Sequence, residues 1–333
     1  MLRSFWYIAC AASRLRTAPR QCRVLDQDLV LFRDASGNPN ALLDRCCHRG
    51  VRLSLGRVLE GTLACGYHGW RYDGTGKCVH IPSLPADRRI PEGALVPAYP
   101  CCEQDGYVWV WIGESGIEPG LPMRIAPYEH FRWRQGSVAM RCAAIKGIEN
   151  NLDWCHPYFA HPWSHGQFFL TRFGGFREQQ YEIRLTESGF VVFTPATADG
   201  DQPIDPNAVV TLRFDLPDRV TVEFTRPLRF VMVMHFIPTG EASCRLEWMA
   251  TRLWPLGPCV RWTDREPRIL AQDRRLLESA QPWYNGTSAD FERSVSADAS
   301  TLLARRVVAL AAEGRWASER PSLPRRRVVR VRA

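Results

Sequence analysis

The sequence contains very little lysine and no long apolar run. Only Lys77 and Lys146 are lysines, so almost all of its 43 basic residues are arginines, and the formal net charge is +8. The longest apolar runs, such as 5–12 and 107–112, are far shorter than the roughly 20 residues of a membrane-spanning helix. The shortness of these apolar runs argues against a transmembrane enzyme. Because the arginines are scattered except near the C-terminus, nucleic acid binding is also disfavoured.

Several other signatures are missing. The sequence has no internal repeat, no G-x-G-x-x-G nucleotide loop and no plant-type ferredoxin cysteine set. A length of 333 residues corresponds to about two domains. Twelve cysteines in such a chain do not suggest the disulfide framework of a short secreted protein. The start, MLRSFWYIACAAS, is similar to a short signal peptide, but its aromatic and β-branched residues favour a first strand over 5–10.

Short strands separated by Gly, Pro, Asn and Asp dominate the first third of the chain. The clearest are 28–33, 41–44 and 106–113, the last being rich in aromatic and β-branched residues. Gly and Pro become frequent again near residues 114–122. We therefore predict two domains, 1–118 and 119–333.

The second domain mixes helices and strands. We predict a helix over 145–159 whose end is disturbed by Pro157, and two further helices over 267–280 and 297–313. Antiparallel strands are predicted at 181–185, 189–194, 208–214, 219–225, 228–238 and 242–254. The basic tail 325–332 is expected to be loosely ordered. The fold class is α+β: an all-β N-terminal domain, then an antiparallel sheet flanked by helices, helix-grip-like.

Two Cys–His pairs in the first domain indicate a metal site. They are separated by sixteen residues and consist of Cys46, His48, Cys65 and His68. Such a set fits either tetrahedral zinc or a [2Fe–2S] cluster with mixed ligands. A cluster needs tight turns with backbone N–H donors and aromatic shielding, and Gly50, Gly69 and Trp70 provide both. Cys47 could replace Cys46, but the C-x-H spacing selects Cys46.

A second metal site is indicated in the other domain. Asp153 and His156 lie three residues apart, and a helix kinked at Pro157 can bring His156 and His161 to one point. Asp273 falls within an apolar helical stripe formed by Ile269, Leu270, Leu276, Leu277 and Ala280. A carboxylate facing a core must be paired or bind a metal. The three side chains fit a 2-His-1-carboxylate iron site; the alternatives are surface histidines and an arginine salt bridge.

Both patterns resemble the Rieske non-haem iron oxygenases, in their demethylase-like or monooxygenase branch. The family pattern C-x-H-(15–17)-C-x-x-H-G-W is met at residues 46–70, and N-x-x-D-x-x-H-x(4)-H at 150–161. The stretch D-(K/R)-x-(L/V)-(L/V)-E-x-x-Q-P matches 273–282. Respiratory Rieske proteins carry disulfide cysteines where this chain has Val51 and Tyr67, a departure that favours a ferredoxin or an oxygenase.

The resemblance implies a role for each site residue. Cys46 and Cys65 would hold one iron of the [2Fe–2S] cluster, and His48 and His68 the other. The mononuclear Fe(II) would be bound by His156, His161 and Asp273. Asp153 would be the carboxylate that links a cluster histidine to an iron histidine of the neighbouring subunit in a head-to-tail homotrimer, and Asn150 belongs to the same catalytic segment.

The resemblance also implies an activity. The protein would use O2, with electrons from NAD(P)H delivered by a separate reductase or ferredoxin. It would hydroxylate, or oxidatively O- or N-demethylate, an aromatic or heterocyclic small molecule in natural-product biosynthesis or aromatic catabolism. The resemblance favours a cytoplasmic enzyme with neither nucleic acid nor membrane as a partner. The rivals are a Rieske ferredoxin-like electron carrier and a zinc-bearing scaffold.

The substrate pocket is expected under the antiparallel sheet. Its predicted lining is 190–194, 231–235, Phe168 and Phe169, which would suit a flat apolar molecule. His235 would either contact substrate or belong to the core. The basic tail is expected to dock an acidic reductase or ferredoxin.

Overall fold

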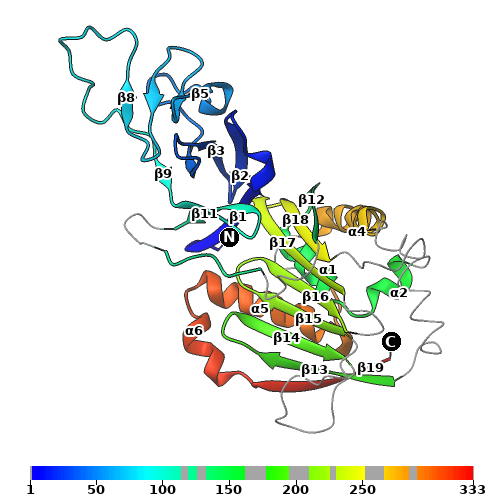
Figure 1. Ribbon diagram of the computed structural model, residues 1–333. Coiled ribbons are helices and arrows are strands. Elements are labelled where there is room, and N and C mark those ends of the chain that lie inside the picture. The colour runs from blue at the N-terminus through cyan, green and yellow to red at the C-terminus, as the bar shows by residue number, and fades with distance from the viewer. Residues whose placement is uncertain are drawn as a thin grey trace. The chain divides into compact units, whose positions relative to one another are not determined.

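The computed structural model describes residues 2–113, 119–125, 133–161, 178–194, 210–225, 230–251, 266–284 and 291–332. Two compact units divide the chain, Arg3–Pro127 and Tyr128–Ala333 (Figure 1). Contacts group residues up to Pro127 with the first unit. The boundary at 118 stays a prediction, because residues 114–118 lie outside the described part of the chain.

The described part of the N-terminal unit consists of three small antiparallel sheets and short 3-10 turns. The first sheet has the order β1 (Phe5–Ala11), β11 (Tyr107–Ile112), β10 (Cys101–Gln104). The second contains β2 (Arg20–Val24), β3 (Gln27–Arg33), β4 (Pro39–Leu43) and β9 (Ala98–Tyr99). The third contains β5 (Arg57–Leu59), β6 (Thr62–Ala64), β7 (Arg71–Tyr72) and β8 (Cys78–His80). The predicted all-β character and the first strand are therefore confirmed.

An eight-stranded antiparallel sheet forms the centre of the second unit. Its order is β12 (Trp133–Met140), β18 (Ser243–Thr251), β17 (Phe230–Gly240), β16 (Arg219–Phe224), β15 (Val210–Asp215), β14 (Gly189–Thr194), β13 (Glu178–Leu185) and β19 (Arg326–Arg332). The helices are α1 (Ala144–Leu152), α2 (His156–Ala160), α4 (Glu266–Ala280), α5 (Ala299–Ala312) and α6 (Trp316–Glu319). None of the helices in the described ranges has the length and apolar character to cross a membrane.

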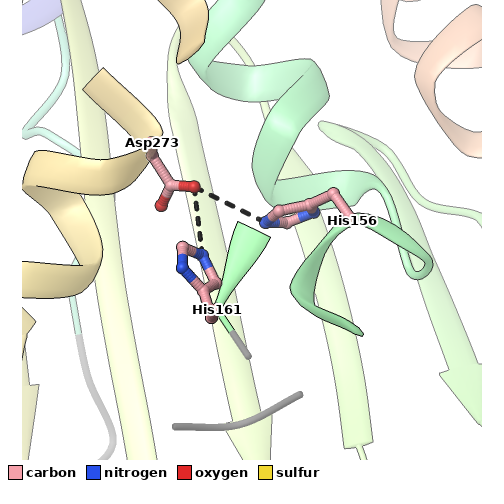
Figure 2. A group of neighbouring side chains, drawn as sticks. All are labelled: His156, His161 and Asp273. Carbon is pink, nitrogen blue, oxygen red and sulfur yellow. Dashed lines mark ion pairs between the residues drawn. The ribbon is translucent and has the colours of Figure 1, made fainter. Parts of the chain in front are cut away.

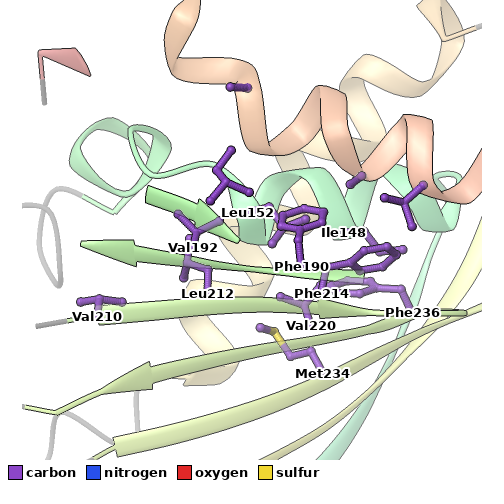
Figure 3. Packing of buried hydrophobic residues seen from close by; sticks show 14 of the residues in the cluster. Ile148, Leu152, Phe190, Val192, Val210, Leu212, Phe214, Val220, Met234 and Phe236 are labelled. Atoms are coloured by element: carbon purple, nitrogen blue, oxygen red, sulfur yellow. The ribbon is translucent and has the colours of Figure 1, made fainter. Parts of the chain in front are cut away.

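The core of this unit lies between the sheet and the helices (Figure 3). Side chains alternate along a strand, so Val210, Leu212 and Phe214 of β15 all face the core. From the helix side, Ile148 and Leu152 of α1 pack into the same cluster. The helix can approach closely because it has a glycine at 147: a Cβ there would lie 2.3 Å from the Phe236 ring.

The structure corrects the predicted helix over 145–159. Two helices are present, and Asp153, which follows α1, has an extended backbone with φ −80° and ψ 119°. Pro157 lies in the first turn of α2, where its missing N–H costs no hydrogen bond. The proline therefore starts a helix instead of ending one.

The predictions at the two edges of the sheet also need correction. The tail is not loosely ordered: it forms edge strand β19, which pairs with β13 in register and buries Val329 and Val331. Its arginines alternate with these valines, and the alternation is the strand signal that their charge obscured. The structure adds β12, which was not predicted. The predicted strand 242–254 extends past Thr251 into residues outside the described part.

Candidate metal centres

Two loops of the N-terminal unit share one backbone geometry. The Gly50 N–H donates to the Cys46 carbonyl at 2.9 Å, and the Gly69 N–H donates to the Cys65 carbonyl at 3.0 Å. Both glycines have left-handed backbones, with φ of 73° and 72°, a conformation that a Cβ would strain. Each loop therefore turns tightly from its cysteine, and the glycines in the sequence pattern are explained.

The four predicted cluster ligands lie together at these loops. Cys46 and Cys65 are buried, with 3% and 5% of their surface exposed, and their thiols are neighbours. The rings of His48 and His68 lie nearer the surface, 4.7 Å apart. His48 stacks on Trp70 with 4.5 Å between ring centroids and 5° between planes. The buried sulfurs and accessible imidazoles thus form two separate pairs.

This arrangement favours a cluster over zinc. The four ligands of one zinc ion must converge within the few ångströms that bonds of about 2.0–2.3 Å allow. Among the described residues, the one group whose ligand atoms all lie within 4.8 Å of one another is in the other unit. The cysteine pair and the histidine pair therefore fit two irons, one held by the two sulfurs and the other by the two imidazoles.

Tyr72 is a neighbour of this site that the sequence patterns do not single out. Its hydroxyl lies 3.1 Å from Cys46 Sγ and 3.3 Å from Cys47 Sγ. Burial raises the pKa of Tyr72, so the hydroxyl keeps its proton and can donate. Its position, four residues after His68 in a short strand, is the only signal that the sequence offers.

The second centre brings together His156, His161 and Asp273 (Figure 2). Their ligand atoms all lie within 4.8 Å of one another. Asp273 Oδ1 is 3.1 Å from His161 Nε2 and 3.8 Å from His156 Nε2. The three side chains come from α4, from the first residue of α2 and from the residue after α2. These are the residues that the sequence predicted.

Hydrogen bonds at the far side of each ring fix how the histidines face the centre. Asp153 provides a backbone carbonyl 3.0 Å from His156 Nδ1, and Gln272 provides Oε1 2.9 Å from His161 Nδ1. Since these oxygens only accept, each Nδ1 carries the proton, and in a neutral ring Nε2 is left with its lone pair. Both lone pairs then face the centre, as in metal-bound histidines.

Charge and burial at the centre also fit a cation. Asp273 Oδ1 is buried and has no hydrogen-bond donor in the described part of the chain, although His161 Nε2 lies beside it. Burial lowers the pKa of His156. Burial also lowers the pKa of His161, but Asp273 and Gln272 outweigh it and raise that pKa. Two imidazoles and a carboxylate with open positions are the donor set of non-haem Fe(II) sites.

Asn150 and Asp153 both lie beside the histidine ligands. Asn150 Nδ2 is 3.4 Å from His156 Nε2. Asp153 Oδ1 accepts from the backbone N–H groups of Cys155 at 2.7 Å and His156 at 3.3 Å. Asp153 and His156 are therefore hydrogen-bonded, as their spacing predicts, but not across the face of one helix. Asp153 lies between two helices and accepts from N–H groups at the start of the second.

Side chains at the end of α4 and directly after it also reach the segment that enters α1. Glu278 accepts from the Arg141 N–H at 2.9 Å, and Gln281 Oε1 accepts from the Ala143 N–H at 2.7 Å. The helix that carries Asp273 is therefore fastened to the start of α1, and α1 leads to His156. In the stretch 273–282, Asp273 therefore faces the metal centre, and Glu278 and Gln281 hold the segment before α1.

An apolar cavity adjoins the three ligands. Its walls come from β15, β16, β17 and α4 and include Leu212, Phe224, Phe230, Met232, Met234 and Leu270. The predicted lining was correct at Met232 and Met234. It was wrong for 190–194: none of these residues lines the cavity, and Phe190 and Val192 pack in the core beneath the helices. Phe168 and Phe169 lie outside the described residues.

His235 belongs to the core. Residues 231, 233 and 235 point to the sheet face opposite Met232 and Met234, because side chains alternate along β17. His235 is 5% exposed, and its Nδ1 lies 2.9 Å from Asp218 Oδ1. The alternative of a substrate contact is therefore excluded in this structure.

Comparison with known proteins identifies the first domain and the family of the chain. A family model described as the Rieske [2Fe–2S] domain matches residues 5–100. The chain is 33% identical over 303 residues to the oxygenase subunit of 3-chlorobenzoate-3,4-dioxygenase from Comamonas testosteroni, covering 85% of this chain and 67% of that protein. It is 42% identical over 282 residues to protein TIC 55 from Pisum sativum, covering 79% of this chain and 48% of that protein. The chain spans about half or less of the length of six of the relatives that it matches, TIC 55 among them.

Solved structures share the fold of the whole chain. The Pseudomonas putida CBB5 protein NdmA, solved with caffeine, superimposes with a TM-score of 0.77 at 23% identity. The match covers 95% of this chain and 94% of that one. The likeness covers the β-rich first unit and the large sheet of the second. With the relationship to the dioxygenase subunit, it shows that this chain belongs to the family of Rieske oxygenase terminal subunits.

Proposed function

We propose that the protein is an oxygenase that uses O2 to hydroxylate or oxidatively demethylate an aromatic or heterocyclic small molecule. The observation that carries the proposal is the group His156, His161 and Asp273, which is preorganised beside an apolar cavity. When bound, the cluster and the iron would supply electrons and O2 activation. The chain's own residues would hold the metals, orient the ligands and exclude water from the cavity.

The cavity supports the substrate class. Its walls combine aromatic rings with the flexible thioethers of Met232 and Met234, a lining that accommodates flat apolar molecules. Family members are named for chlorinated benzoate and bind caffeine. Both molecules are planar rings, and the cavity is consistent with a substrate of the same kind.

Asp153 would link the two ligand sets between subunits. Both of its recorded hydrogen bonds use Oδ1, so Oδ2 can accept a second partner. His68 is exposed at the cluster end of the N-terminal unit. We infer that His68 of one subunit donates to Asp153 of the next in a head-to-tail homotrimer, a closed ring of identical contacts. Asp153 would then connect His68 to His156 through its side chain and its carbonyl.

The electron supply would come from a separate protein. The sequence contains no nucleotide loop of its own, and relatives are named as oxygenase subunits of larger systems. We infer a reductase or ferredoxin that takes electrons from NAD(P)H. The eleven described cysteines form no disulfide, which suits a reducing, cytoplasmic location.

The rival function is electron transfer without oxygenation. A buried ligand triad would then have no role, and its Asp273 would be a costly buried carboxylate. Iron analysis separates the two readings: the oxygenase should hold three irons per chain and the carrier two. Oxygen consumption by the reduced protein across a panel of methoxylated, N-methylated and unsubstituted rings, with product masses, should then identify the reaction. No substrate-dependent oxygen consumption by protein with three irons would refute the oxygenase.

A further inference from the structure

Tyr72 lies between two sulfur atoms of different accessibility. Its hydroxyl is 3.1 Å from the sulfur of Cys46 and 3.3 Å from that of Cys47. Cys46 and Tyr72 are buried, whereas Cys47 is exposed. Cys46 is the cluster ligand selected by the C-x-H spacing, and it lies beside the other predicted ligand sulfur, Cys65. Cys47 is therefore a second sulfur that contacts the same hydroxyl without belonging to the ligand set.

Counting protons gives the direction of both hydrogen bonds. A hydroxyl has one proton and two lone pairs, and an iron-bound cysteine sulfur has no proton and can only accept. Tyr72 therefore donates its proton to Cys46. Its oxygen can then accept the S–H proton of Cys47. The three groups form a chain in which Cys47 donates to Tyr72 and Tyr72 donates to Cys46.

We propose that Cys47 is a residue that sets the reduction potential of the [2Fe–2S] cluster through Tyr72. Hydrogen bonds to ligand sulfurs stabilise the reduced, more negative cluster and so raise its potential. A donor behind Tyr72 polarises the hydroxyl and strengthens its bond to Cys46. The proposal rests on the cluster assignment and does not depend on which substrate the other centre oxidises.

Other groups nearby do not replace Cys47 in this chain. The Cys78 thiol donates to the His80 carbonyl at 3.6 Å and is buried. Trp70 stacks on His48 and so acts at the histidine side. In the described part of the chain, the Tyr72 hydroxyl forms hydrogen bonds only with Cys46 and Cys47. The effect of Cys47 should therefore need Tyr72.

The test is an anaerobic redox titration of the cluster in the full-length protein, followed by electron paramagnetic resonance of the reduced form. Cys47→Ala should lower the potential, changing the reduction equilibrium about two- to tenfold, as expected for one modest hydrogen bond. Cys47→Ser keeps a donor and should stay near wild type. Tyr72→Phe should lower the potential further. Cys102→Ala, on strand β10, is the matched control and should change nothing.

The decisive comparison is Cys47→Ala in the Tyr72→Phe background. If Cys47 acts through Tyr72, the substitution should have no further effect there. The proposal would be overturned if Cys47→Ala shifted the reduction potential equally with Tyr72 and with Phe at position 72. It would also be overturned if Cys47→Ala raised the potential, or left it unchanged in both proteins. Loss of the cluster from Cys47→Ala would overturn it as well, by making Cys47 a ligand. Because only the cluster is measured, these outcomes are distinct from a failure of the oxygenase assignment.

Discussion

Asp153 has two separable roles, and substitutions can distinguish them. One oxygen of its side chain holds the start of α2 by accepting from the N–H groups of Cys155 and His156. The negative charge and the other oxygen would serve the link to His68 of a neighbouring subunit. Asn keeps an oxygen acceptor for the cap and removes the charge, whereas Ala removes both. The pair Asp153→Asn and Asp153→Ala therefore separates stability from electron transfer.

The structure gives the expected size of each effect. Loss of a hydrogen bond of this kind costs about 1 kcal/mol, which lowers Tm by roughly 2–4 °C in a domain of 150–250 residues. Asp153→Ala should show this loss, and Asp153→Asn should not. Both variants should keep the iron, because His156 Nδ1 donates to the backbone carbonyl of Asp153 and not to its side chain.

Electron transfer should fail in both variants. We expect oxidation of the reduced cluster by O2 and substrate to slow by roughly 10- to 100-fold or more, the usual cost of losing a side chain next to the ligands of a metal, because the link to His68 is lost. The assay is stopped-flow absorbance of the cluster in a single turnover, with iron content and Tm measured on the same samples. A wild-type rate for Asp153→Asn would remove Asp153 from the electron path. If Asp153→Asn lowered Tm by the same roughly 2–4 °C as Asp153→Ala, the negative charge of Asp153 and not its oxygen acceptor would stabilise α2.

Three further predictions follow from the second unit. His156→Ala should lose the mononuclear iron and keep the resonance signal of the reduced cluster; loss of both signals would argue for a different ligand set. Gln281→Ala should weaken iron binding because the Ala143 N–H loses its acceptor; dialysis against graded Fe(II) should show a several-fold rise in Kd, and an unchanged Kd would show that α4 is held without it. Arg326→Ala should destabilise the fold by roughly 2 kcal/mol in urea unfolding at pH 7, since buried Glu182 loses a partner 2.9 Å away. Burial raises the pKa of Glu182, but Arg184 and Arg326 outweigh it and lower that pKa. The ion pairs of Glu182 therefore stabilise the fold at pH values above the pKa of Glu182 in the unfolded chain, and this stabilisation is lost as the pH falls through its lower pKa in the folded chain. The variant should therefore lose less stability than wild type on acidification, and parallel pH profiles would refute this role.

The sequence by itself determined the cluster site. Cys46, His48, Cys65 and His68 sit in two tight loops whose glycines and spacing are local properties. Strand positions such as 189–194 followed from runs of β-branched and aromatic residues, which also need only neighbouring residues. Even Asp273 was recognisable, because a carboxylate inside an apolar helical stripe is out of place without a partner. The stripe itself was only partly right, since Leu276 is 51% exposed.

The tertiary structure decided what depends on residues far apart in the chain. It showed that Gln272 orients His161 across 111 residues and that Gln281 caps the entry to α1 across 138. It placed the tail at the sheet edge opposite Glu182, where its charge neutralises a buried carboxylate. Local patterns report which residues are suited to a metal, a turn or a strand. Which side chain meets which is settled only when packing brings distant segments together, because the energy of a buried contact exists only in the folded chain.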